Sequence, residues 1–143
     1  MLRLNRGAGV TIVRHLPATA VALGFIDRIN RGDLEGLVSM MAADHRLEVF
    51  DEPPVVGRAA NAKAWQGYLN AFPRYVIYPR RIAAAGDVVA ILGHTTGSHL
   101  GLPDSAEREL LLIWLAYVQD GVVDRWCLIE DSPSSRKRFG LDG

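Results

Sequence analysis

Two polar sites interrupt the apolar C-terminal half of the chain and could take part in chemistry. Thr95 and His99 lie in a segment that leads into a Gly-Leu-Pro turn at 101–103, and Glu130 ends an apolar strand. A carboxylate in a dry pocket has a raised pKa and can exchange protons near neutrality. We therefore predict that Glu130 is a general acid or base, and that His99 or Thr95 donates a hydrogen bond to a developing oxyanion.

Each of these residues also has a purely structural interpretation. Glu130 at a strand end is otherwise a solvent-exposed or salt-bridged carboxylate, and His99 otherwise caps the turn before Gly101. His45 either faces the site or only begins the first strand. His94 is expected on the exterior or at an interface.

Three amphipathic helices are predicted in the first half of the chain, because apolar residues recur there at three- and four-residue spacing. The first runs from Pro17 or Thr19 to Gly32, and the second, capped by Asp33, runs through Met41. The third covers 62–72 and ends at Pro73.

Strands dominate the second half. Two short ones are expected at 45–50 and 55–57, and four longer ones at 75–83, 88–99, 109–119 and 122–130. Helices followed by a run of antiparallel strands indicate the α+β class. We expect three N-terminal helices on a strongly curved, mostly antiparallel sheet that encloses a pocket. Residues 17–141 would form one domain after a tail over 1–16.

Alternation along the predicted strands assigns side chains to the pocket. Trp126, Leu128 and Glu130 share one face, while Gly93 and Gly97 share a face with Thr95 and His99 and would leave empty volume. The expected substrate-binding wall is mostly apolar and aromatic, and its members are His45, Trp65, Tyr68, Thr95, Leu112, Trp114, Trp126 and Leu128.

Composition excludes several classes of protein. The 143 residues carry 16 basic and 16 acidic side chains, so no electrostatic field favours nucleic acid or an anionic membrane. The single cysteine excludes an internal disulfide, and no pair of the four histidines has the spacing of a helical metal site. No run approaches ~18 apolar residues, and residues 1–16 lack a signal-peptide core. We expect a cytoplasmic protein without metal or cofactor.

The strand over 110–118 is apolar in both of its alternating sets, so both faces of the sheet should be covered. The helices cover one face. Since no further long helix is apparent, a second subunit is expected on the other, and we predict a homodimer. The charges at 136–138 are expected to be solvated or to lie at the dimer rim.

The order and spacing of several short motifs resemble the SnoaL-like branch of the nuclear transport factor 2-like superfamily, from about Leu16 to Leu141. The motifs are Phe25–Asp33, Met41–His45, Val56–Arg58, Gly97–Pro103, and Asp120–Gly121 followed by Trp126 and Glu130. The resemblance implies a cystatin-like cone. In the cyclases of this branch the final strand has an acidic position, which Glu130 would occupy.

The same fold hosts cyclases, isomerases, epoxide hydrolases and pure binding proteins, so it does not by itself define an activity. Limonene epoxide hydrolases use an Asp-Arg-Asp set, and the corresponding residues here are Thr95, Gly93 and Leu128. This departure argues against epoxide hydrolysis. The Asp and Tyr pattern of ketosteroid isomerases is not recoverable either.

Two functions remain. The first is a cofactor-independent cyclase or isomerase that binds a small, largely apolar carbonyl compound, with Glu130 as acid or base. The second is a homodimer that binds a hydrophobic ligand without turnover. Glu130 favours chemistry, because an unused carboxylate is costly in an apolar cavity. Beyond Glu130 and His99 the predicted pocket is nearly all apolar, and this lack of a further ionisable group favours binding without turnover.

Overall fold

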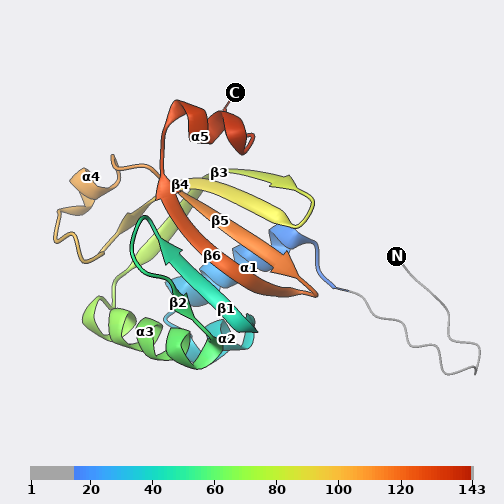
Figure 1. Cartoon of the computed structure of the whole chain (residues 1–143). Helices are drawn as coiled ribbons and strands as arrows, with labels where there is room; N and C mark the ends of the chain where they lie inside the picture. Colours follow the sequence, from blue (N-terminus) through green and yellow to red (C-terminus); the bar gives the residue numbers. More distant parts are fainter. Residues whose placement is uncertain (1–14, 143) are drawn as a thin grey trace, which may run out of the picture.

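The computed structural model describes residues 15–142, so most of the predicted tail over 1–16 lies outside the described residues. Helices and strands alternate early and strands dominate later (Figure 1). The elements are α1 (Ala18–Asn30), α2 (Leu34–Ser39), β1 (Met41–Val49), β2 (Val55–Val56), α3 (Arg58–Ala71), β3 (Val76–Ala85), β4 (Val88–Thr96), α4 (Asp104–Glu107), β5 (Leu112–Gln119), β6 (Val122–Glu130) and α5 (Pro133–Arg138).

Local sequence signals set the helix ends. Gly32, just beyond α1, has a φ of +65°, a left-handed conformation that glycine adopts at low cost. The Asp33 carboxylate accepts a hydrogen bond from Gly36 N at 2.9 Å and caps α2. The second helix ends earlier than predicted, because Met41 already pairs with Val123 of β6. Tertiary pairing here overrides a helical apolar pattern.

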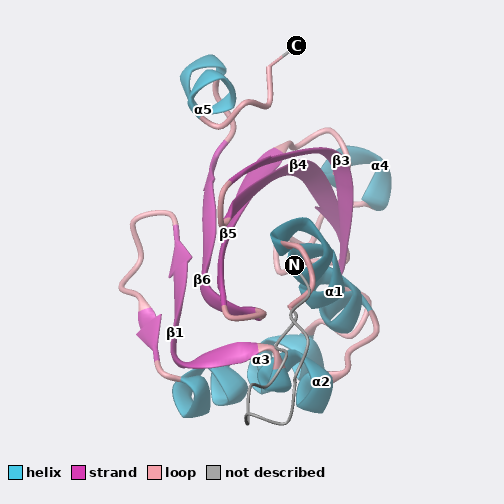
Figure 2. Cartoon of the chain, turned by 90° about the vertical axis from the view of Figure 1, so that its right-hand side faces the viewer, coloured by secondary structure: helices cyan, strands magenta, loops and turns pink. Residues whose placement is uncertain are grey.

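The strands form one curled, unclosed sheet in the order β2-β1-β6-β5-β4-β3. All neighbours are antiparallel except β1 and β6, which are parallel. Register shifts interrupt three of the pairings, and such bulges increase strand bending. Figure 2 shows the sheet curling around α1, with α2 and α3 below it. The predicted α+β cone is confirmed.

The concave face of the sheet holds the main core. Phe25 and Ile29 of α1 are buried against it, together with Ile91, Trp114 and Trp126 of three neighbouring strands. The rings of Phe25 and Trp126 lie 4.8 Å apart. Packing at the centre of the curl therefore fixes the orientation of the strands that continue toward α3.

The convex face carries a second buried cluster, in which Leu92, Ile113 and Leu115 are joined by Leu141 from the end of the chain. The segment over residues 131–142, here called the C-terminal cover, folds back toward this face, and Arg81 Nη1 donates a hydrogen bond to Leu141 O at 2.6 Å. Part of the covering that the sequence suggested for a second subunit therefore comes from the chain itself. The homodimer stays a prediction.

Two elements were not anticipated. The connection between β4 and β5 contains α4, so β5 begins at Leu112 rather than at 109. The C-terminal cover contains α5, where Ser132 Oγ accepts a hydrogen bond from Ser135 N at 3.1 Å, and Pro133 occupies the first turn. Arg136, predicted as a solvated or dimer-rim charge, forms an ion pair with Asp131 at 2.7 Å and stays partly exposed, so the dimer-rim role stays a prediction.

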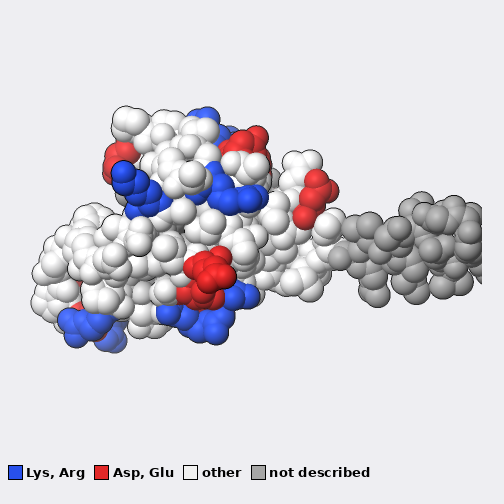
Figure 3. Space-filling view, turned by 90° about the horizontal axis from the view of Figure 1, so that it is seen from below, with Lys and Arg blue, Asp and Glu red and all other residues white. Residues whose placement is uncertain are grey.

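Charged side chains do not gather into one region on the face shown in Figure 3, where small basic and acidic groups lie among uncharged surface. Within residues 15–142, no helix combines the length and apolar character needed to cross a membrane.

Candidate functional site

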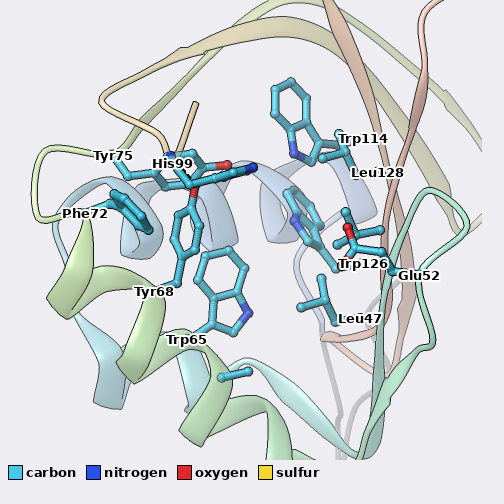
Figure 4. Close-up of a pocket in the computed structure, with 12 residues that line it drawn as sticks. Leu47, Glu52, Trp65, Tyr68, Phe72, Tyr75, His99, Trp114, Trp126 and Leu128 are labelled. Atoms are coloured by element: carbon cyan, nitrogen blue, oxygen red, sulfur yellow. Dashed lines mark hydrogen bonds between the residues drawn. The ribbon is translucent and has the colours of Figure 1, made fainter. Parts of the chain in front are cut away.

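A cavity of about 440 Å³ lies between α3, the turn after β1 and the concave face of the sheet (Figure 4). All three tryptophans of the chain contribute to its wall. The lining residues are Leu47, Val49, Glu52, Ala64, Trp65, Tyr68, Phe72, Tyr75, His99, Trp114, Trp126 and Leu128. A wall of this kind, mostly apolar with few polar groups, is typical of a small-molecule site.

The structure places most of the predicted wall together. Those that line the cavity are Trp65, Tyr68, His99, Trp114, Trp126 and Leu128. They come from α3, the segment after β4, and the two central strands. Phe72 and Tyr75 complete an aromatic group at the end of α3, where the Tyr68 ring lies 4.8 Å from Phe72 and 5.0 Å from Tyr75.

Tyr68 and His99 form the polar end of the cavity. The Tyr68 hydroxyl oxygen accepts the His99 backbone N–H at 3.2 Å and lies 2.8 Å from His99 Nδ1. Donation of the Tyr68 hydroxyl hydrogen to His99 Nδ1 satisfies both groups. On this basis we assign the Nε2–H tautomer to His99. The remaining ring nitrogen, Nε2, then carries a hydrogen that is free to meet a ligand. Burial raises the pKa of Tyr68, which keeps its hydroxyl protonated.

A buried carboxylate holds the segment that carries His99. Glu107 of α4 is 1% exposed, accepts a hydrogen bond from the Thr95 hydroxyl, and is 3.4 Å from the Ser98 backbone nitrogen. Thr95 is thereby engaged behind the wall and does not line the cavity, contrary to its predicted position. Nothing in the sequence marked Glu107, because an acidic residue in a short polar connection is usually exposed.

His45 and Leu112 also lie outside the cavity lining, which corrects their predicted positions. His45 is fully buried, and its Nδ1 bonds Val123 O at 2.7 Å. Burial lowers the pKa of this imidazole. Leu112 is half-buried at the start of β5, where it pairs with Glu130. Both side chains support the sheet beside the cavity.

The predicted position of Glu130 in the cavity is also corrected. The side chain is exposed and absent from the wall, although strand alternation puts it on the face of Trp126 and Leu128. Glu130 is the last residue of β6, so it lies beyond the rim. The carboxylate that does line the cavity is Glu52, from a turn after β1 that was expected to be only a connection.

The glycines at 93 and 97 do not open the cavity. A Cβ at Gly93 would meet the Tyr78 carbonyl oxygen, and a Cβ at Gly97 would meet that of Arg74. Gly97 also has a φ of +69°. These glycines permit close approach of backbone segments.

Metal binding and thiol chemistry are not supported by the residues that the structure describes. Within residues 15–142, no three His, Cys, Asp or Glu side chains lie close enough to hold a metal ion. Cys127 is buried on the convex side beside Glu48, and burial raises the pKa of its thiol to about 12. A thiol of this kind is a poor nucleophile. The candidate site is therefore the cavity with its Tyr68–His99 pair.

Comparisons with solved structures find the same architecture. A proposed polyketide cyclase from Sinorhizobium meliloti is 23% identical, with 80% of this chain and 95% of the other covered and a TM-score of 0.65. A cystatin-fold protein from Novosphingobium aromaticivorans is 16% identical, with 80% and 99% covered and a TM-score of 0.69. TerC is 18% identical, with 87% and 99% covered and a TM-score of 0.66.

A search of curated proteins returned no match. The family described as the SnoaL-like domain matches residues 22–126, which include α1 through most of β6. That match spans more than half of the chain. The protein belongs to the SnoaL-like family.

Proposed function

We propose that the cavity binds a small, largely apolar carbonyl compound, with the His99 Nε2–H donated to its carbonyl oxygen. The observation that carries this proposal is the Tyr68–His99 hydrogen bond of 2.8 Å at the polar end of a mostly apolar wall. It orients the imidazole before any ligand arrives, and a preorganised donor is most effective where charge develops. TerC, a structural neighbour, was co-crystallized with polyporic acid, an observation that supports the proposal of a small organic ligand.

The proposed chemistry is proton transfer beside the carbonyl group. Glu52 would take a proton from the carbon next to the carbonyl, and the electron pair would move to the oxygen that His99 holds. In a β,γ-unsaturated ketone, return of the proton from Glu52 to the γ-carbon would move the double bond into conjugation. Where the ligand carries a second carbonyl, attack of the α-carbon on it would close a ring, and the resulting alkoxide would take the proton back from Glu52. Neither route needs a cofactor, because one carboxylate and one hydrogen-bond donor complete each step.

Ligand binding without turnover is the second candidate. Glu52 lines the cavity from an exposed turn, so its carboxylate is better solvated than a general base in a dry site. The wall also holds no second carboxylate. Under this alternative His99 would serve only to select ligands that carry an oxygen.

A matched pair of ligands tests the binding step. 2-Tetralone and tetralin share a carbon skeleton and differ in one carbonyl group. We expect the protein to prefer the ketone by about threefold to tenfold, the usual worth of one hydrogen bond. His99→Phe should abolish this preference. His94→Phe should retain it, since His94 stacks on Tyr78 outside the cavity wall. Equal affinity of the native protein for both compounds would contradict the proposal.

Exchange of the ketone's α-hydrogens for deuterium, followed by NMR, separates the two candidates. We expect the protein to accelerate exchange in 2-tetralone and Glu52→Gln to slow it by roughly 100-fold, a common share of acid-base catalysis. Loss of exchange in Glu130→Gln alone would restore the catalytic role predicted from the sequence. Binding without any acceleration would establish the ligand-binding alternative.

A further inference from the structure

Glu107 is a buried carboxylate to which the proposed function assigns no step. It is 1% exposed, although it belongs to α4, a single helical turn in the connection between β4 and β5. A buried charge costs free energy unless hydrogen bonds satisfy it. The Thr95 hydroxyl bonds one of its oxygens and the Ser98 backbone N–H lies against the other. The carboxylate therefore closes the loop over residues 95–107, which carries His99.

The turn that carries His99 has few other contacts that fix its place. β4 ends at Thr96, and residues 97–103 form neither strand nor helix. Within the turn, Leu100 N bonds Ser98 Oγ at 3.2 Å, and Gly101 N lies 3.4 Å from Ser98 O. These local contacts shape the turn but do not join it to the sheet. Glu107 joins it, because the same carboxylate contacts both Ser98 and the last turns of β4.

His99 needs a defined backbone position to meet Tyr68. The Tyr68 hydroxyl accepts the His99 backbone N–H at 3.2 Å and lies 2.8 Å from Nδ1. In Figure 4 the His99 ring lies beside Tyr68 and extends toward the middle of the cavity. A shift of roughly 0.5 Å would lengthen the backbone contact beyond ~3.5 Å, where a hydrogen bond no longer forms. Glu107 holds Ser98, the residue immediately before His99.

We propose that Glu107 is a positioning residue for His99. Its hydrogen bonds hold the 97–103 turn where Tyr68 fixes the imidazole and the Nε2–H is directed into the cavity. The role is one of placement rather than charge, so a neutral side chain with the same hydrogen bonds should perform it. The consequence for ligands rests on the proposed function, whereas the orientation of His99 is a property of the free protein.

The tautomer of His99 gives a readout that needs no ligand. At about pH 8.5, where a histidine is ordinarily neutral, ¹⁵N NMR of the native protein should show the Nε2–H form. Glu107→Met keeps the side-chain length without the acceptors, so its His99 signals should be averaged between the two tautomers. Glu107→Gln can accept from Ser98 and donate to the Thr95 hydroxyl oxygen, and it should keep the native signals. Glu109→Met, which alters an exposed carboxylate of the same connection, is the matched control.

The ketone preference tests the consequence for binding. Glu107→Met should reduce the preference for 2-tetralone over tetralin to less than about twofold, and should leave the affinity for tetralin within about twofold. In the His99→Phe background the same substitution should change the preference no further, because it acts through His99. A packing defect would weaken the binding of both compounds alike.

Thr95→Val provides the test if Glu107→Met does not fold. It keeps the shape of a β-branched side chain and the carboxylate of Glu107, but it removes one of the two contacts. The His99 signals should again be averaged, to a smaller extent than in Glu107→Met.

Three outcomes would overturn the inference. Native His99 signals in both Glu107→Met and Thr95→Val would show that the turn keeps its place without the carboxylate. Averaged signals in Glu107→Gln would show that hydrogen bonding alone does not position the ring. A further change of ketone preference by Glu107→Met in the His99→Phe background would show that Glu107 does not act through His99.

Failure of the proposed function has a different signature. Equal affinity of the native protein for 2-tetralone and tetralin would remove the role of His99 in binding a carbonyl group. The His99 signals of the Glu107 variants would still decide whether Glu107 positions the ring.

Discussion

The concave and convex faces of the sheet are both apolar, yet they are completed in different ways. Helix α1 fills one part of the concave face, and the remaining part faces α3 across a cavity of about 440 Å³. The C-terminal cover packs on the convex face, where its Leu141 is fully buried in the second cluster. An apolar strand pattern thus predicts that both faces of the sheet are covered. It does not predict whether a helix, a ligand or the end of the chain covers each face.

The largest expected effect concerns the seal of the convex face. Leu141→Ala should lower the free energy of unfolding by about 2–5 kcal/mol, the cost of an emptied buried leucine site. Leu23→Ala on α1 is the control, since Leu23 is 38% exposed and should cost less than about 1 kcal/mol. Urea denaturation measures both. Similar small losses would show that the C-terminal cover contributes little, and the contrast between the faces would fail.

The oligomeric state tests how much of the convex face the C-terminal cover shields from solvent. Beyond the cover, the convex surface presents Tyr117 beneath the Arg125 guanidinium, 4.3 Å from its ring centroid. We expect a homodimer that uses this uncovered part, with twice the 15.7 kDa mass of one chain. Light scattering at micromolar concentration checks this. A mass of one chain would mean that the C-terminal cover alone completes the face.

The smallest effect is a difference in pH dependence between the faces. On the concave side, burial holds the pKa of His45 below its ordinary 6.5, so stability present above pH 6.5 declines as pH falls below it. On the convex side, Arg125 lowers the pKa of Glu48 from 4.5 to about 2, so stability present above pH 4.5 is lost as pH falls toward 2. The two windows do not coincide.

Urea denaturation at about pH 7.5, 5.5 and 3.5 resolves these windows. His45→Gln should flatten the change between the first two conditions, and Glu48→Gln the change between the last two. If His45→Gln retains the full loss between pH 7.5 and 5.5, the buried imidazole is not its source.

The sequence predicted the three N-terminal helices, the strands and four of the aromatic residues in the wall, because these depend on local periodicity. It misplaced Glu130, since alternation gives the face of a side chain but not its distance from the rim. The prediction that Gly97 leaves empty volume in the cavity was wrong. Gly97 has a positive φ, and its backbone packs against Arg74. Glu52 carried no local signal, because it reaches the cavity only through the pairing of β1 with β6. The Ser132-Pro133 pair at the start of α5 is a helix N-terminal signal that the prediction did not use.

The parallel pairing of β1 with β6 has a consequence for the order of folding. Leu47 and Trp126 are neighbours in this pairing and both line the cavity, although most of the chain separates them. Closing such a long loop is entropically costly and slow relative to local contacts. During synthesis the N-terminal helices emerge early, but the binding wall cannot close until β6 has left the ribosome. A ligand can therefore bind and stabilise only the fully synthesised, folded chain. It should slow unfolding far more than it speeds folding.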